Sequence, residues 1–263
     1  MQTIFGLSAF DAGLLFLAGL IGSAVNAVAG GGTFFTFPAF LSTGVASIIA
    51  NASNAVAIWP GRLLAIAAYR RELHRQRERA LWTGVVCFLG GIAGAWLLLS
   101  SDDKTFLRTV PWLILAATLL FLFDRPISAR FGVRDGGVRP SPLVMAGLSV
   151  PLFLCAMYGG FFGGGLGVMM MPVLSLTGVR DMQELNGLKN VLVTVITGVA
   201  VAMFMVGGAV SWPGTIVMMA GALIGGYAGG YLARLIPARI LKAIVICVGF
   251  FLAGYYFWKV YVA

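Results

Sequence analysis

Long apolar runs are the feature that most constrains this chain. Only 10% of its residues are charged, against about 25% in a soluble domain. Most of the runs approach the length that a membrane-crossing helix needs, about 20 residues. In lipid the backbone must pair with itself, so we predict an all-α polytopic membrane protein of about 8–10 helical segments. The runs cover residues 8–29, 33–50, 54–69, 80–100, 105–123, 143–162, 166–178, 187–206, 212–233 and 239–262.

The positive charges indicate how the chain sits in the membrane. The net charge is +9, but the cations stand in bursts between apolar runs, as Lys and Arg do in cytoplasmic loops. We therefore expect no nucleic-acid partner. If each half crosses an odd number of times, segments 69–79, 124–140, 178–189 and 234–242 all face the cytoplasm and carry 14 of the 18 Lys and Arg residues. This predicts a multi-pass protein of a bacterial-type inner (plasma) membrane, with both termini on the non-cytoplasmic side.

The two halves of the chain resemble each other. "VAGGGTFFTFP" and "FFGGGLGVMMMP" each place a triple glycine ahead of a proline inside an apolar region. Internal duplication is a hallmark of secondary transporters, and an odd number of crossings makes the repeats inverted. We predict a first transmembrane repeat over 1–123, a cytoplasmic basic linker over 124–142 and a second repeat over 143–263. The matches at an offset of 134 or 135 residues are Pro38 and Pro172, Gly30 and Gly164, Gly31 and Gly165, and Asn51 and Asn186.

The glycine-rich stretches predict a broken helix in each half. Glycine costs a helix interior about 1 kcal/mol and proline about 3 kcal/mol. The segment 33–43 reaches only about half of the bilayer core at about 1.5 Å per residue. Each half is therefore expected to hold either a re-entrant hairpin with three full spans or two short crossings with three more. The sequence leaves these two alternatives open.

Breaks of this kind can bind anions. Non-helical backbone at membrane depth survives only when it is buried in protein or lines a wet cavity, and the N-terminus of a helix presents free N–H groups and a positive dipole. The alternative is close packing of small residues, which we favour for 90–98 and 221–233. At the two breaks we expect substrate binding by Gly30, Gly31, Gly32, Thr33, Gly163, Gly164 and Gly165.

Polar residues follow each break inside apolar sequence. Asn186, Asn190, Thr194 and Thr197 share one helix face by their spacing, which indicates a wet path. The alternative is that the Asn residues are N-caps and that the Thr hydroxyls bond to carbonyls four residues earlier. Arg62 lies about 12 Å along the helix from the charged end of its apolar run. It either marks a substrate path through the membrane or extends its side chain to the membrane surface. We assign to the substrate site Asn51, Asn54, Arg62, Asn186, Lys189, Asn190 and Thr194.

The sequence offers little for catalysis. Acidic residues lie at or near the ends of apolar runs, the single histidine, His74, lies in an arginine-rich segment, and each of the three cysteines stands alone. No metal-binding or phosphate-loop motif is present. We expect no enzyme activity, no metal and no cofactor.

The duplicated pattern "AVAGGGTFFTFPAFLSTGV…NASNAV" and "GGFFGGGLGVMMMPVLSLTGV…NGLKNV" resembles the TauE/SafE sulfite-exporter family, also called the toluene-sulfonate uptake permeases. The resemblance covers nearly the whole chain. It implies a permease or exporter that moves sulfur-containing anions such as sulfite or organosulfonates, and we expect alternating access coupled to protons. A passive anion channel and a non-transporting scaffold subunit are the alternatives; homo-oligomerisation stays open. Thr33 stands where the second copy has Gly167, so the two half-sites are not expected to be equal.

Overall fold

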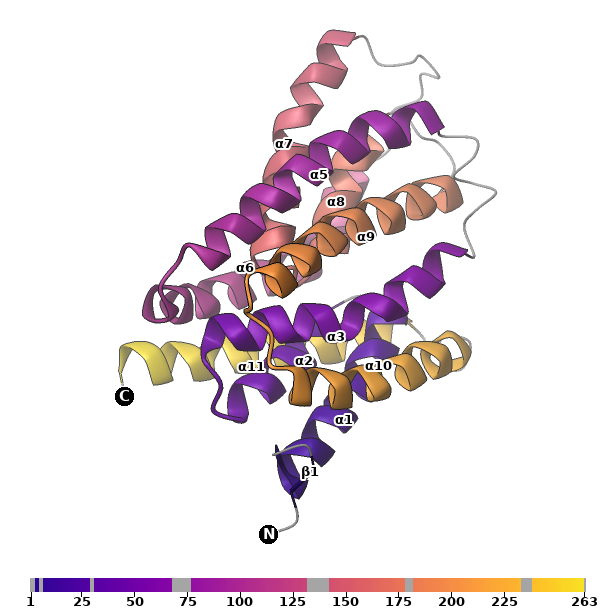
Figure 1. Cartoon of the computed structure of the whole chain (residues 1–263). Helices are drawn as coiled ribbons and strands as arrows, with labels where there is room; N and C mark the ends of the chain where they lie inside the picture. Colours follow the sequence, from indigo (N-terminus) through magenta and orange to yellow (C-terminus); the bar gives the residue numbers. More distant parts are fainter. Residues whose placement is uncertain are drawn as a thin grey trace.

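The computed structural model describes residues 3–4, 7–28, 31–67, 77–131, 142–177, 182–232 and 238–262. Within these residues the chain forms ten α-helices and one small antiparallel hairpin of β1 (Thr3–Ile4) and β2 (Leu7–Ser8) (Figure 1). Five of the helices are long and apolar enough to cross a membrane. The predicted helical membrane class is therefore confirmed, while the hairpin was not predicted. Gly30 and most of the basic linker lie outside the described residues.

The same order of helices occurs in both halves. Each half has a long helix, a helix of ten residues and three more long helices. The first half contains α1 (Ala9–Val28), α2 (Thr33–Ser42), α3 (Ser47–Ala67), α5 (Arg77–Leu99) and α6 (Asp103–Phe131). The second half contains α7 (Pro142–Phe161), α8 (Leu166–Ser175), α9 (Met182–Val206), α10 (Trp212–Leu232) and α11 (Ala238–Tyr261).

The two halves interlock instead of forming separate bundles. Helix α1 packs on α10, and its counterpart α7 packs on α5, the counterpart of α10. Helix α5 also packs on α9, and its counterpart α10 packs on α3. Two further pairings join counterparts directly, α6 with α11 and α3 with α9. Exchanging the halves therefore leaves the main helix pairings unchanged.

Glycines permit the closest of these helix approaches. A Cβ added to Gly94 of α5 would collide with the carbonyl oxygen of Met157 on α7, and one added to Gly225 of α10 would collide with that of Leu20 on α1. Backbones that approach this closely leave no room for a side chain. The predicted close packing is confirmed for the glycines of 90–98 and for Gly221 and Gly225 of 221–233, whereas an added Cβ at Gly226 would meet nothing within 4 Å.

Each glycine-rich break reverses the direction of the chain. Gly31 and Gly165 have φ values of 84° and 74°, a left-handed conformation that favours glycine. Helix α2 then folds back along α1, so that a Cβ on Gly22 would meet Thr36, and in the second half Gly159 of α7 faces Leu166 of α8. Ten helical residues rise about 15 Å, half of the bilayer core. The re-entrant hairpin and the two short crossings both stay predictions.

The polar residues after the breaks lie inside helices, and the N-cap interpretation is wrong. Helix α3 begins at Ser47, four residues before Asn51, and α9 begins at Met182, four residues before Asn186. The carboxylate of Asp103 on α6 caps α3 instead. Its Oδ1 accepts hydrogen bonds from the Ser47 hydroxyl at 2.8 Å and the Ile48 N–H at 2.9 Å. A cap supplied from another helix leaves no local sequence signal.

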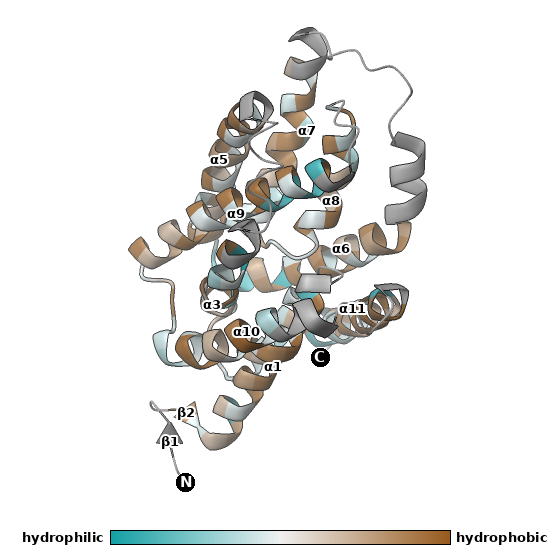
Figure 2. Cartoon of the chain, turned by 90° about the vertical axis from the view of Figure 1, so that its right-hand side faces the viewer, coloured by the Kyte–Doolittle hydropathy of each residue, from teal (hydrophilic) through white to brown (hydrophobic). Residues whose placement is uncertain are grey.

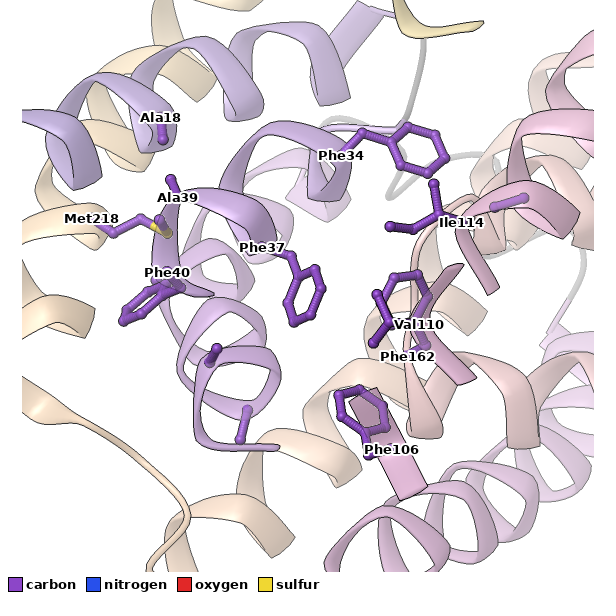
Figure 3. Packing of buried hydrophobic residues seen from close by; sticks show 14 of the residues in the cluster. Ala18, Phe34, Phe37, Ala39, Phe40, Phe106, Val110, Ile114, Phe162 and Met218 are labelled. Atoms are coloured by element: carbon purple, nitrogen blue, oxygen red, sulfur yellow. The ribbon is translucent and has the colours of Figure 1, made fainter. Parts of the chain in front are cut away.

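An aromatic core fixes the short helix α2. The ring of Phe37 lies edge-to-face against Phe106 of α6 and Phe162, with centroid distances of 6.5 and 5.6 Å (Figure 3). Outside this core, apolar side chains such as Trp96 and Phe251 are exposed on the helix surfaces, as expected for a protein in lipid. Hydrophilic residues gather instead in the middle of the bundle, near α3, α8 and α9 (Figure 2).

Candidate functional site

A cavity lies between α2, α3, α9 and the end of α7. The centre of a water molecule can occupy a volume of about 20 Å³ in this cavity. About 10–15 Å³ of such space is enough for one water molecule. The cavity can therefore hold water in this conformation and must widen to admit an anion. Its lining consists of Thr33, Asn51, Asn54, Ala55, Ile58, Arg62, Gly159, Gly160, Phe162, Gly163, Thr197, Ala200 and Phe204.

Helix α3 supplies the polar wall of this cavity. Asn51, Asn54, Ile58 and Arg62 follow one another at three- or four-residue spacing and so share one helix face. Asn51 and Asn54 are each only 2% exposed. The Asn51 amide nitrogen donates a hydrogen bond of 2.9 Å to the carbonyl oxygen of Phe161, which ties α3 to the break in the other half.

Three buried polar atoms in this wall have no hydrogen-bond partner. They are Oδ1 of Asn51, Oδ1 of Asn54 and Nε of Arg62. In folded proteins the large majority of buried polar side-chain atoms are paired, and exceptions call for an explanation. All three belong to residues that line one cavity, which indicates that a ligand or water pairs with them there.

The cavity carries an uncompensated positive charge. Arg62 is the only ionisable residue among the described residues of the lining, and none of the described carboxylates forms an ion pair with it. Its side chain is half-buried with Nε enclosed, and a charge withdrawn from water is costly unless it is paired. The electrostatics of the cavity therefore favour an anion.

Trp59 fixes the crossing of α3 and α9 beside the cavity. Its indole N–H donates to the carbonyl oxygen of Thr194 at 3.3 Å. The indole rests on Gly198, where an added Cβ would lie 3.1 Å from Nε1. Thr194 is the counterpart of Trp59 at the repeat offset of 135 residues, so the two halves meet at equivalent positions.

The threonines of α9 are paired within their own helix. The hydroxyls of Thr194 and Thr197 donate to the carbonyl oxygens of Asn190 and Val193, each at 2.8 Å. The alternative interpretation of these threonines, bonding to carbonyls four residues earlier, is confirmed.

The left-handed glycines of the two breaks face an apolar ring. Cβ atoms added to Gly31 and Gly165 would lie 3.4 and 3.3 Å from the same atom, Cε2 of Phe121. Phe121 is 1% exposed. The two breaks thus approach each other closely, but a phenylalanine side chain of α6 lies against both.

The structure brings together only some of the predicted site residues. Lys189 and Asn186 lie outside the cavity lining and bond to each other, Nζ to Oδ1, at 3.1 Å. The predicted residues that line the cavity are Thr33, Asn51, Asn54, Arg62 and Gly163. The predicted residues that do not line it are Gly31, Gly32, Gly164, Gly165, Asn186, Lys189, Asn190 and Thr194, and Gly30 lies outside the described residues.

Several lining residues were not predicted. Ile58 could have been found, because it shares a helix face with Asn54 and Arg62. Ala200 and Phe204 follow Thr197 at three- and seven-residue spacing on α9. Gly159 and Gly160 gave no such signal, since packing glycines of the same kind occur throughout the chain.

Fold and cavity together define a polytopic helical membrane protein with a buried, positively charged cavity between two interlocked halves. The chain belongs to the sulfite exporter TauE/SafE family, whose model matches residues 15–256. This confirms the resemblance seen in the sequence.

Bacterial relatives of similar length carry transporter names. The chain is 31% identical to a probable membrane transporter protein of Haemophilus influenzae, over 92% of both chains. It is 28% identical to the probable membrane transporter protein ORF9 of Sinorhizobium sp., over 91% of this chain and 89% of the relative. It is 24% identical to the probable membrane transporter protein YfcA of Escherichia coli K12, over 94% of this chain and 90% of the relative. No solved structure matches the chain significantly.

Proposed function

We propose that this protein is a secondary transporter that moves a small sulfur-containing anion, such as sulfite or an organosulfonate, by alternating access. The observation that carries the proposal is Arg62, a cation without a carboxylate partner among the described residues, in a cavity that also holds unpaired amide groups. The family supplies the preference for sulfur. The cavity supports the negative charge of the substrate.

Inverted repeats support the transport mechanism. In Figure 1, α3 and its counterpart α9 run in opposite directions, and so do α5 and α10. Repeats of this kind allow a protein to exchange an outward-open for an inward-open state around one site. The positive charges of the sequence place the termini on the non-cytoplasmic side in this proposal.

Proton coupling is part of the proposal. The described residues that line the cavity include no carboxylate or histidine that could carry a proton. The proton then travels on the substrate or on Lys189, whose Nζ lies in the second half. An anion that enters with its proton is driven inward by a pH gradient.

The test is anion flux into liposomes that contain the purified protein. With equal sulfite on both sides, an imposed pH gradient should drive net accumulation, which a passive channel would not sustain. Arg62→Gln should abolish flux, whereas Thr118→Val should retain it, because the Thr118 hydroxyl bonds within α6 to Ile114 at 2.7 Å, away from the cavity. Wild-type flux in Arg62→Gln contradicts the proposed site, and no flux with any anion favours the scaffold alternative.

A further inference from the structure

We infer that the cavity selects a two-ended anion, with an oxyanion head at Arg62 and a hydrogen-bond donor at the end near Asn51 and Asn54. This inference rests on the proposed function, because it assumes that the cavity is the substrate site. It adds the requirement that the ligand carries a hydrogen-bond donor, which the charge of Arg62 alone does not impose.

The orientation of the Asn51 amide carries the argument. Its nitrogen donates to the carbonyl oxygen of Phe161. A carbonyl oxygen only accepts hydrogen bonds, so the amide cannot be turned round without losing this bond. Oδ1 of Asn51 must then point elsewhere, and it is buried without a partner. What this oxygen requires is a donor, which a bare oxyanion does not offer.

Asn54 can serve the same donor. It is one helical turn from Asn51, and its Oδ1 is also buried without a partner. No described residue bonds to the Asn54 amide, so it can turn and present either its oxygen or its NH2 group to a ligand. The fixed acceptor is therefore Oδ1 of Asn51, against which an anionic oxygen would be repelled and an O–H or N–H group would pair.

The position of Arg62 sets the length of the ligand. It follows Asn54 by eight residues, about 12 Å of helix rise. The Arg side chain slants toward the N-terminus of its helix, which shortens this gap. In this proposal a short chain of atoms joins the anionic head at Arg62 to the donor at Asn51.

A matched pair of ligands tests the inference. 2-Hydroxyethanesulfonate and propane-1-sulfonate have the same head and nearly the same length, but only the first carries a donor. Competition with transported sulfite should show that wild-type protein binds the hydroxyl ligand about tenfold more tightly, because the ligand without a donor leaves a buried acceptor unpaired. Asn51→Leu should remove most of this preference, and Thr118→Val should retain it.

A second variant keeps the test decisive if Asn51→Leu fails to fold. Asn54→Leu keeps the bond between Asn51 and Phe161, and it should also reduce the preference for the hydroxyl ligand. Equal affinity for both ligands in the wild type, or an unchanged preference in both Asn variants, overturns the inference while leaving the proposed function intact. Failure of both sulfonates and of sulfite to bind contradicts the proposed function itself.

Discussion

The two halves share a framework but differ in how their equivalent polar residues are used. In the first half, Asn51 and Asn54 line the cavity with unpaired oxygens. Their counterparts at the repeat offset, Asn186 and Lys189, lie outside it and bond to each other. Helix order and close packing are similar in the two halves, whereas the breaks differ in detail, since Gly32 before α2 is right-handed and Gly165 before α8 is left-handed. At the equivalent polar positions the difference arises from the side chains.

This difference shows that an internal repeat predicts backbone more reliably than it predicts a site. The breaks and the packing glycines depend on local backbone geometry, which a duplicated sequence reproduces. A binding site depends on what a side chain meets across the molecule. Asn51 meets Phe161, which is 110 residues away in the sequence, whereas Asn186 accepts a hydrogen bond from Lys189 of its own helix.

The largest expected effect concerns the cations of the two halves, Arg62 and Lys189. Arg62→Gln should lower anion flux in liposomes by about 100-fold or more, since removing one partner of a buried charge pair costs about 2–5 kcal/mol. When the proton travels on the substrate, Lys189→Gln should lower it by less than about tenfold, because Lys189 already has an amide partner and does not line the cavity. Equal losses in the two variants would show that both halves contribute equally to binding.

A smaller effect should be equal in the two halves. Gly94→Val and Gly225→Val each force a side chain into the backbone of a neighbouring helix, and overpacking costs about 1–3 kcal/mol. Thermal unfolding in detergent should show similar destabilisation in both. Gly84→Val and Gly226→Val are the controls, because nothing lies within 4 Å of an added Cβ there. Destabilisation confined to one half would contradict the shared framework.

The cap on α3 is a further point at which the halves differ. Asp103 accepts hydrogen bonds from Ser47 and Ile48, whereas Ala238 occupies the equivalent position at the start of α11. Asp103→Ala should cost about 1 kcal/mol of stability, as the loss of a cap usually does. Asp103→Asn keeps an acceptor and should lose less in the same thermal unfolding measurement. Identical losses of stability in the two variants would show that the carboxylate charge, and not its hydrogen bonds, stabilises the start of α3.

These features also show how much of the fold and of the site could be predicted from the sequence. The apolar runs and the glycine motifs predicted the helices, the breaks at Gly31 and Gly165, and the packing segments, because each depends on residues close together in the chain. The start of α3 was misplaced, since its cap comes from Asp103 on a distant helix. The sequence placed Asn51 in the site but could not reveal its bond to Phe161 or the position of Phe121 against both breaks.

The smallest effect concerns Thr33 and Gly167, one of the positions where the duplicated motifs differ at the start of the short helices. Thr33 of α2 lines the cavity, while its counterpart Gly167 of α8 does not. Thr33→Val removes a hydroxyl with little change of shape and should weaken anion binding about fivefold, the worth of one hydrogen bond of about 1 kcal/mol. Gly167→Ala should leave the affinity unchanged, because its Cβ would lie 3.8 Å from the stem of Lys189 in ordinary contact. Thermal shift titration with sulfite measures both, and a larger loss in Gly167→Ala would mean that the second half-site binds the anion more strongly than the first.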